Sequence, residues 1–376
     1  MPSKHPYIGL PDYQFWKNEP AIDRQTPLDP VTKVSFSITP EEPVVTAGSC
    51  FAQHVANALQ RSGFNFMVTE QPHAMIPRPL ARKHNYMIFS ARYGNVYTAR
   101  QLKQLLQRAY GLFEPEESVW NGSDGSVVDP FRPQIQPGGF VNAEELERDR
   151  EYHLDSVRKA IESLSVFVFT LGLTEAWIDK RDGTVFPLAP GVAGGTFDEK
   201  LFAFENFGVE SIVEDMQWSL DFIRSKNPGA KFVITVSPVP LNATYADRHV
   251  WVSTTYSKAV LRVAAEQITS SNELCDYFPS YEIITSPFAR GRYYLPDCRG
   301  VKGTGVNQAM RVFLRHYGGE EAVARLPVRK TKVPLAVRKK RQAARKAKQN
   351  RKQDSHISRM ENMLEVLCDE ESISNK

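Results

Sequence analysis

The turn Gly48-Ser49-Cys50 carries two side chains that can act as nucleophiles, a hydroxyl and a thiol. It follows the apolar run 43–47, and apolar residues then recur at helical spacing up to residue 63, so the sequence predicts a strand, a tight turn and a helix. A helix N-terminus lowers the pKa of a thiol, because its unpaired amides and dipole stabilise the thiolate. Cys50 is therefore a candidate nucleophile. The structural alternative is a small buried hydrophobe, with Ser49 as the helix N-cap.

The elements that must position this turn alternate between apolar runs and helical patterns, which is typical of a parallel sheet flanked by helices. Buried strands are predicted at 165–172 and 231–238, and a last strand near 277–285. Helices are predicted over 98–110, 143–163, 208–226, 256–270 and 304–317. We expect a doubly wound, mostly parallel α/β fold, in which such a turn opens at the carboxyl edge of the sheet, where ligands bind.

The chain of 376 residues divides by composition into three regions. Residues 1–39 are expected to form an N-terminal extension, 40–325 the α/β domain with an irregular insertion near 112–140, and 326–376 a C-terminal tail. The net charge is +4, but the window 329–352 holds twelve Lys or Arg and no Asp or Glu, so the rest is acidic, near −8. This distribution argues against a nucleic-acid surface spread over the fold.

The C-terminal tail is expected to lie outside the core, as a basic helical or disordered extension. Its charge run is either simply solvated or contacts an anionic partner or surface. An apolar stripe beyond the charge run could serve self-association, although it is short for a coiled coil. The stripe consists of Ile357, Met360, Leu364 and Leu367.

Several classes of protein are excluded by the pattern of special residues. The four cysteines fit neither a disulfide framework nor a zinc spacing, and the glycines of 191–195 do not form a phosphate loop, so no metal and no cofactor is expected. The longest apolar run, near 166–173, is too short for a transmembrane helix. The first twenty residues lack the pattern of a secretory signal, so a cytoplasmic protein is expected.

The string Gly48-Ser49-Cys50-Phe51-Ala52-Gln53 is the motif that names the GSCFA family, and this sequence resembles that family over roughly 40–320. Further matching stretches lie at 93–98, 170–177 and 235–241. The family is itself similar to the SGNH/GDSL hydrolases. The resemblance implies an SGNH-like fold and an ester hydrolase or acyltransferase, whose substrate would be a small-molecule or carbohydrate ester.

The SGNH blocks imply roles for residues of this chain, with departures. Their nucleophilic serine corresponds to Cys50, or to Ser49 if the alignment shifts by one. Gly94 and Asn95 resemble the block that supplies a glycine amide to the oxyanion hole. Thr174 stands where those enzymes have an asparagine donor, and one such donor is worth about 3 kcal/mol of barrier.

The fourth SGNH block, Asp-x-x-His, is the largest departure, because Asp297 is kept while its histidine is absent. A nucleophile needs a base within reach. His249 is the candidate we favour, since it follows the strand at 231–238 and so leaves the same sheet edge that presents Cys50. Glu175 or Asp297 would orient it. The alternative function is a catalytically degenerate module that binds a ligand or partner. For Glu175 by itself, the structural alternative is a charge at the start of a helix that interacts favourably with the helix dipole.

Overall fold

The computed structural model describes residues 5–23, 26–122, 124–326 and 368–374. Its centre is a four-stranded parallel sheet with the order β1-β4-β8-β9. β1 and β4 are buried along their whole length, as expected for strands covered on both faces. The strands are β1 (Val44–Gly48), β4 (Val166–Leu171), β8 (Lys231–Val236) and β9 (Cys275–Phe278).

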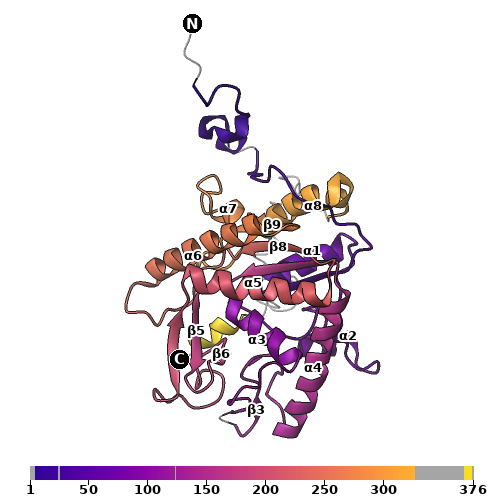
Figure 1. Cartoon of the computed structure of the whole chain (residues 1–376), viewed down its shortest axis with the longest axis vertical. Helices are drawn as coiled ribbons and strands as arrows, with labels where there is room; N and C mark the ends of the chain where they lie inside the picture. Colours follow the sequence, from indigo (N-terminus) through magenta and orange to yellow (C-terminus); the bar gives the residue numbers. More distant parts are fainter. Residues whose placement is uncertain (1–4, 24–25, 123, 327–367, 375–376) are drawn as a thin grey trace, which may run out of the picture.

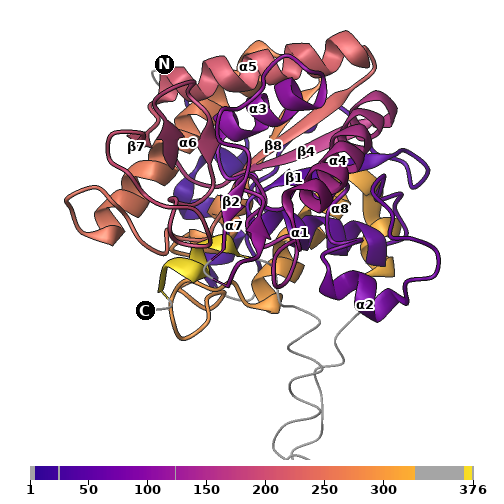
Figure 2. The same ribbon diagram turned by 90° about the horizontal axis from the view of Figure 1, so that it is seen from below.

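Helices cover both faces of the sheet, with α3 and α5 on one side and α1 and α8 on the other (Figure 2). Side chains of β4 alternate between the two cores: Phe167 and Phe169 face the first side, and Val166 and Val168 the second. The predicted doubly wound α/β fold is therefore confirmed. The helices are α1 (Cys50–Arg61), α2 (Arg78–Lys83), α3 (Ala99–Ala109), α4 (Ala143–Ser163), α5 (Val209–Lys226), α6 (Val250–Ser271), α7 (Ser280–Thr285) and α8 (Gly303–Arg325), the last interrupted at Gly319.

The chain reverses its direction across the sheet after β1. Helix α1 leads to Phe66, which forms a parallel bridge to Val44 on the free side of β1, and the chain then returns to β4 on the other side. In such sheets the strand ends on either side of the reversal open a crevice for ligands. Here that crevice is bounded by the turn after β1, at 48–50, and the turn after β4, at 172–174.

A second, antiparallel sheet of order β6-β5-β7 follows β4, and it corrects one expectation. Glu175 was expected to begin a helix, but it is the first residue of β5 (Glu175–Asp179), which pairs along its length with β7 (Phe202–Asn206). The physical reason is that pairing with a distant segment decides the structure of a five-residue stretch more than its own pattern does. The short β6 (Val185–Phe186) completes this sheet.

Two other expectations need adjustment. The strand predicted near 277–285 ends at Phe278, and α7 follows, because Pro279 has no N–H to donate to the ladder and instead precedes the helix. The irregular insertion near 112–140 contains a small hairpin of β2 (Trp120–Asn121) and β3 (Val127–Val128).

The N-terminal segment projects from the body, whereas the described C-terminal segment lies against it (Figure 1). The N-terminal segment runs away from the body with three short 3-10 helices, at Asp12–Gln14, Trp16–Asn18 and Pro20–Asp23. The C-terminal 3-10 helix η4 (Asp369–Ser374) lies beside β5 and β6. Cys368 and Asp369 are only 6% and 2% exposed, so the expectation that 326–376 lies outside the core is wrong for this segment. The basic run and the apolar stripe lie outside the described residues.

Gly48 is predicted to be the least replaceable residue of the β1–α1 turn. It has φ +131, and an added Cβ would lie 2.4 Å from the Thr170 carbonyl oxygen. We expect Gly48→Ala to lower the free energy of unfolding by about 3 kcal/mol or more, measured by chemical denaturation. Gly111→Ala is the matched control, because Gly111 also has positive φ (+68) but meets nothing within 4 Å, so its loss should be about 1 kcal/mol. Equal losses in the two variants would contradict the close contact.

Candidate active site

The β1–α1 turn places Ser49 and Cys50 at the crevice. The Ser49 N–H donates to the Thr170 carbonyl at 3.1 Å, which fixes the turn against the end of β4. Ser49 holds the N-cap position, but its side chain makes no capping hydrogen bond, and its buried hydroxyl has no partner among the described residues. Cys50 is the first residue of α1 and is also buried. The thiol therefore stands at the helix N-terminus, as the sequence predicts.

The thiol of Cys50 meets a second thiol from the C-terminal segment. The side chains of Cys50 and Cys368 interact, and Arg299 Nη2 lies 3.6 Å from Cys368 Sγ. The hydrogen bond to Cys368, burial and the carboxylate of Glu370 raise the pKa of Cys50 well above its ordinary value, although Arg299 opposes this. The same hydrogen bond lowers the pKa of Cys368. Cys50 is therefore the protonated donor of the pair.

Two carboxylates beside Cys368 are held by groups of the body. Asp369 Oδ2 accepts from Asn95 Nδ2 at 2.8 Å and from the Tyr97 hydroxyl at 3.3 Å. Glu370 accepts from Arg299 Nη2 at 2.9 Å and from the Asn242 N–H at 3.1 Å. Burial raises the pKa of Asp369 to about 6. The segment thus fills the crevice with one thiol and two acidic side chains.

Lys258 is a site residue that the sequence analysis missed. It lies on α6, is 2% exposed, and its Nζ donates to the Gly172 carbonyl at 2.5 Å. Burial lowers the pKa of Lys258 to about 8, although the charges of Glu370 and Cys50 act to raise it. The available signal was its spacing, because Lys258 falls one helical turn before Leu261 on the apolar face of α6, where a cation is out of place.

Arg299 is the second missed residue, and it comes from the stretch where the SGNH histidine is absent. Asp297 Oδ1 accepts the N–H groups of Arg299 and Gly300, both at 3.0 Å. This turn directs Arg299 toward Cys368 and Glu370. Asp297 itself is exposed. It therefore positions Arg299 through the backbone of this turn.

His249 and Glu175 do not meet the thiol in the structure. His249 is exposed, and its Nδ1 accepts from the Trp251 N–H at 3.1 Å at the start of α6. No hydrogen bond within the described ranges joins it to Ser49 or Cys50, so the structure does not support the hypothesis that His249 is the base. Glu175 is half-buried and accepts from the Thr244 hydroxyl at 2.6 Å.

The three expected oxyanion donors are placed differently. Gly94 is buried with φ +69, and its N–H has no acceptor among the residues that the structure describes. Asn95 Nδ2 already holds a carboxylate oxygen. Thr174 is less available, because its hydroxyl donates to Asn206 Oδ1 at 2.6 Å and its N–H donates to the Ser257 hydroxyl at 3.1 Å. Of the three, Gly94 has an N–H without an acceptor in the described residues, and Asn95 already donates to a carboxylate.

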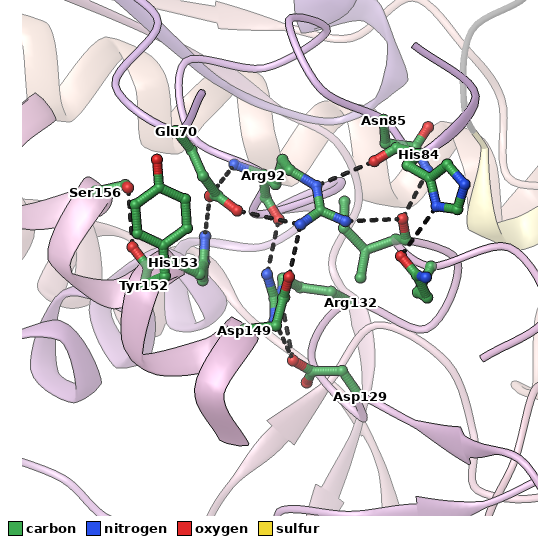
Figure 3. Close-up of polar contacts among 12 residues, drawn as sticks. Glu70, His84, Asn85, Arg92, Asp129, Arg132, Asp149, Tyr152, His153 and Ser156 are labelled. Atoms are coloured by element: carbon green, nitrogen blue, oxygen red, sulfur yellow. Dashed lines mark hydrogen bonds and ion pairs between the residues drawn. The ribbon is translucent and has the colours of Figure 1, made fainter. Parts of the chain in front are cut away.

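A buried charge network fixes the segment that carries Gly94 and Asn95 (Figure 3). The Arg92 N–H donates to Glu70 Oε2 at 2.6 Å, and Arg92 Nη1 contacts Asp149 Oδ1 at 2.8 Å. His153 Nδ1 lies 2.7 Å from Glu70 Oε2. Burial and the charge of Arg132 lower the pKa of His153, so we assign its Nδ1 as the donor of a neutral ring. The turn at Gly94 and Asn95 is thus anchored two residues away by several charged contacts.

A cavity of about 610 Å³ lies next to the C-terminal segment. Glu175 stands in its wall, and Glu370 and Ile373 border it from the segment. Trp177 packs edge-on to Tyr245, with ring centroids 4.7 Å apart. The rest of the wall is mostly apolar or aromatic and includes Leu188, Phe197, Phe204 and Leu241. Such a wall suits the apolar part of a ligand or the face of a sugar ring.

Comparison with known proteins gives a match to a family model and likenesses among solved structures. The model of the GSCFA family matches residues 43–313. A family 3 carbohydrate esterase of Clostridium thermocellum is similar in structure, with 9% sequence identity and a TM-score of 0.31 over 74% of this chain and 94% of that chain. No curated protein matches the sequence.

Two further findings concern the described part of the chain. None of its helices combines the length and the apolar character that crossing a bilayer requires. None of its His, Cys, Asp and Glu side chains gather in a group of three or more that could hold a metal ion.

The ionisation of Glu70 predicts an acid-dependent loss of stability. Burial opposes its charge, but His153, Arg132 and Arg92 lower the pKa of Glu70 from 4.5 to about 2. A lowered carboxyl pKa stabilises the fold above pH 4.5, and that contribution, about 3 kcal/mol, is lost as the pH falls toward 2. Glu70→Gln should therefore flatten the decrease in unfolding free energy between pH 5 and pH 3. The exposed Glu147→Gln is the control, and an equal slope in both would contradict the network.

The environment of Cys50 predicts how its reactivity depends on the C-terminal segment. Deleting residues 368–376 removes Cys368 and Glu370, both of which raise the pKa of Cys50, and leaves Arg299, which lowers it. We expect the pH midpoint of Cys50 alkylation by iodoacetamide to fall by about one unit or more, followed by peptide mass spectrometry. The exposed Cys298 is the internal control and should keep its profile. An unchanged or higher midpoint for Cys50 would show that the segment does not set its pKa.

Proposed function

This chain belongs to the GSCFA family, and on that premise we propose that it transfers an acyl group from an ester to water or to a hydroxylated acceptor, with Cys50 as the nucleophile. The observation that supports this best is the position of the thiol. Cys50 starts α1 at the carboxyl end of β1, in the crevice where the sheet reverses, and the cation Arg299 acts on its ionisation. A thiolate so placed is suited to attack a carbonyl carbon.

The nucleophile becomes active when residues 368–370 leave the crevice. While they are in place, Cys50 donates its proton to Cys368 and its pKa is high. Once they leave, Cys50 keeps the helix N-terminus and Arg299, both of which favour the thiolate. The ester then takes the place of the segment, with its carbonyl oxygen where Asp369 Oδ2 now lies.

The proposed oxyanion hole is built around the position of Asp369 Oδ2. Asn95 Nδ2 supports the assignment because it already donates to a negatively charged oxygen at 2.8 Å. The N–H groups of Gly94 and Cys50 would be the other donors. Such donors, placed before the reaction, stabilise the charge that develops on the carbonyl oxygen, at about 3 kcal/mol each.

Lys258 is proposed to carry the proton in place of the absent histidine. With a pKa of about 8, it is neutral in about a tenth of the molecules at pH 7, far more than an ordinary lysine. Neutral Lys258 takes the Cys50 proton, the thiolate forms a bond to the acyl carbon, and the ammonium returns the proton to the departing alkoxide. Water or an acceptor hydroxyl then releases the acyl group from sulfur by the same steps in reverse. Arg299 remains charged and serves electrostatically.

The cavity beside Glu175 is the proposed site for the rest of the ester. Its aromatic pair Trp177 and Tyr245 offers ring faces for a sugar, and Glu175 offers a hydrogen-bond acceptor next to them. A carbohydrate ester fits this combination, since sugars expose both apolar C–H faces and hydroxyls.

A binding module without catalysis is the second candidate function. It is favoured by the occupation of the crevice by residues 368–370 and by the exposed position of His249. In that case Asn95, Arg299 and Asn242 hold an acidic ligand and the thiol takes no part.

The test is the chemical fate of an activated acyl ester. We expect 4-nitrophenyl acetate to acetylate Cys50, seen by peptide mass spectrometry, and Cys50→Ala to lower turnover at least about 100-fold. Lys258→Met should lower kcat and change the pH–rate profile, because its proton acceptor is lost. Ser49→Ala is the matched control and should retain the Cys50 adduct. An adduct on Ser49, or turnover unaffected by Cys50→Ala, would overturn the proposal.

A further inference from the structure

The contact between Cys50 and Cys368 has a chemistry of its own. Asn95 Oδ1 accepts from Gln53 Nε2, one turn along α1 from Cys50, at 3.0 Å, and Asn95 Nδ2 donates to Asp369, the residue after Cys368, at 2.8 Å. This bridge brings the two cysteines together, and both are buried, at 4% and 6% exposed. We propose that Cys50 and Cys368 form a reversible disulfide, which makes this pair a redox modification site that joins the C-terminal segment to the first turn of α1. This inference stands apart from acyl transfer, because it needs only the two thiols and an oxidant.

The position of Cys368 is fixed by its neighbours in sequence. Asp369 is held through its side chain by Asn95 and through its N–H by the Tyr97 hydroxyl, 3.0 Å away. Glu370 is held on the other side by Arg299 and by Asn242 Nδ2, which donates to its carbonyl at 2.7 Å. The segment therefore presents one sulfur to Cys50 in a defined register, and Cys50 itself is fixed by the helix.

The electrostatic surroundings divide the roles of the two thiols. Arg299 Nη2 lies 3.6 Å from Cys368 Sγ, and the hydrogen bond from Cys50 also stabilises negative charge on Cys368. Cys368 is therefore the thiol of the pair that ionises more readily, and so the one that reacts first with an oxidant. Cys50, as the protonated partner in contact with it, is placed to act as the resolving thiol.

A hydroperoxide supplies the oxidising equivalents. The Cys368 thiolate attacks the terminal oxygen, the O–O bond breaks, and the released alkoxide takes a proton to leave as an alcohol, or as water from hydrogen peroxide. Cys50, after losing its proton, attacks the sulfur of the Cys368 sulfenic acid, and the hydroxide that leaves is protonated to water. Two thiols lose two electrons and two protons in total, and the hydroperoxide is reduced by two electrons.

The environments of the other two cysteines differ from that of the pair, so we expect the disulfide to form between Cys50 and Cys368. Cys275 lies in β9, and burial raises its pKa to about 12, so it remains an unreactive thiol. Cys298 is exposed, and the only sulfur contact recorded for it in the described chain is with the Pro296 carbonyl, at 3.9 Å. It is next to Arg299 in sequence, so Cys298→Ser is the control for a nearby surface thiol.

The disulfide would also have a functional consequence, and this part rests on the proposed function. Oxidation removes the nucleophile and holds residues 368–370 in the crevice, so the enzyme is inactive until a thiol reductant releases it. Formation of the disulfide itself does not depend on whether the protein transfers acyl groups.

The experiment uses the full chain, reduced, freed of reductant and treated with one equivalent of hydrogen peroxide. After blocking with N-ethylmaleimide in denaturant, so that buried thiols also react, non-reducing peptide mass spectrometry should find the Cys50–Cys368 pair as the main disulfide. The number of blocked thiols should fall from four to two, and dithiothreitol should restore it. Cys298→Ser should still form the pair, whereas Cys50→Ser and Cys368→Ser should not. Thermal unfolding of each variant checks that it is folded.

Two results would overturn the inference: both thiols alkylated after oxidation of the folded parent, or Cys298 as the partner of Cys368. The outcome is independent of catalysis. If the disulfide forms but Cys50 is not acylated, only the proposed function is contradicted. If Cys50 is acylated but no disulfide forms, only the redox proposal is contradicted.

Discussion

The site depends on the close approach of two strand ends, those of β1 and β4. At Gly48 a side chain would collide with the Thr170 backbone, and at Gly172 it would meet Ser49 Cβ at 2.8 Å and the Tyr97 carbonyl at 3.0 Å. Backbone hydrogen bonds then join the turns, from the Ser49 N–H to Thr170 and from the Gly172 N–H to Tyr97 at 2.9 Å. Because these glycines allow the contact, the Ser49–Cys50 turn, the segment that ends at Tyr97 and the end of β4 meet at one point.

The charges at this point constrain one another. Buried cations are costly unless they are paired, and Lys258 and Arg299 lie with little or moderate exposure beside the thiol. Glu370 offsets the charge of Arg299 directly and acts on Lys258 at longer range. The C-terminal segment therefore supplies the counter-charge of the closed site. Any ligand that displaces it must bring a negative or strongly polar group of its own, such as the oxyanion of an acyl transfer.

The sequence predicts much of this arrangement and omits specific parts of it. The buried strands and the helix at Ala143–Ser163 have long, regular patterns, and the Gly48-Ser49-Cys50 turn is identifiable from its position between a strand and a helix. Residues 368–374 have no such pattern, because a short polar segment gains its place only from contacts with residues far away in the chain. Arg299 and Lys258 were missed for the same reason, since the role of a cation depends on which anions the fold brings to it.

The central claim is that a ligand acyl group reacts at Cys50 in the space that residues 368–370 occupy. The most direct measurement is a crystal structure of the Cys50→Ser variant, chosen to slow release of the acyl group, after exposure to an activated acetyl ester. The account predicts an acetyl group on the side chain at position 50, with its oxygen near Asn95 Nδ2 and the Gly94 N–H, and the C-terminal segment displaced. An acetyl group on Ser49, or an adduct elsewhere with Asp369 still bound to Asn95, would contradict it.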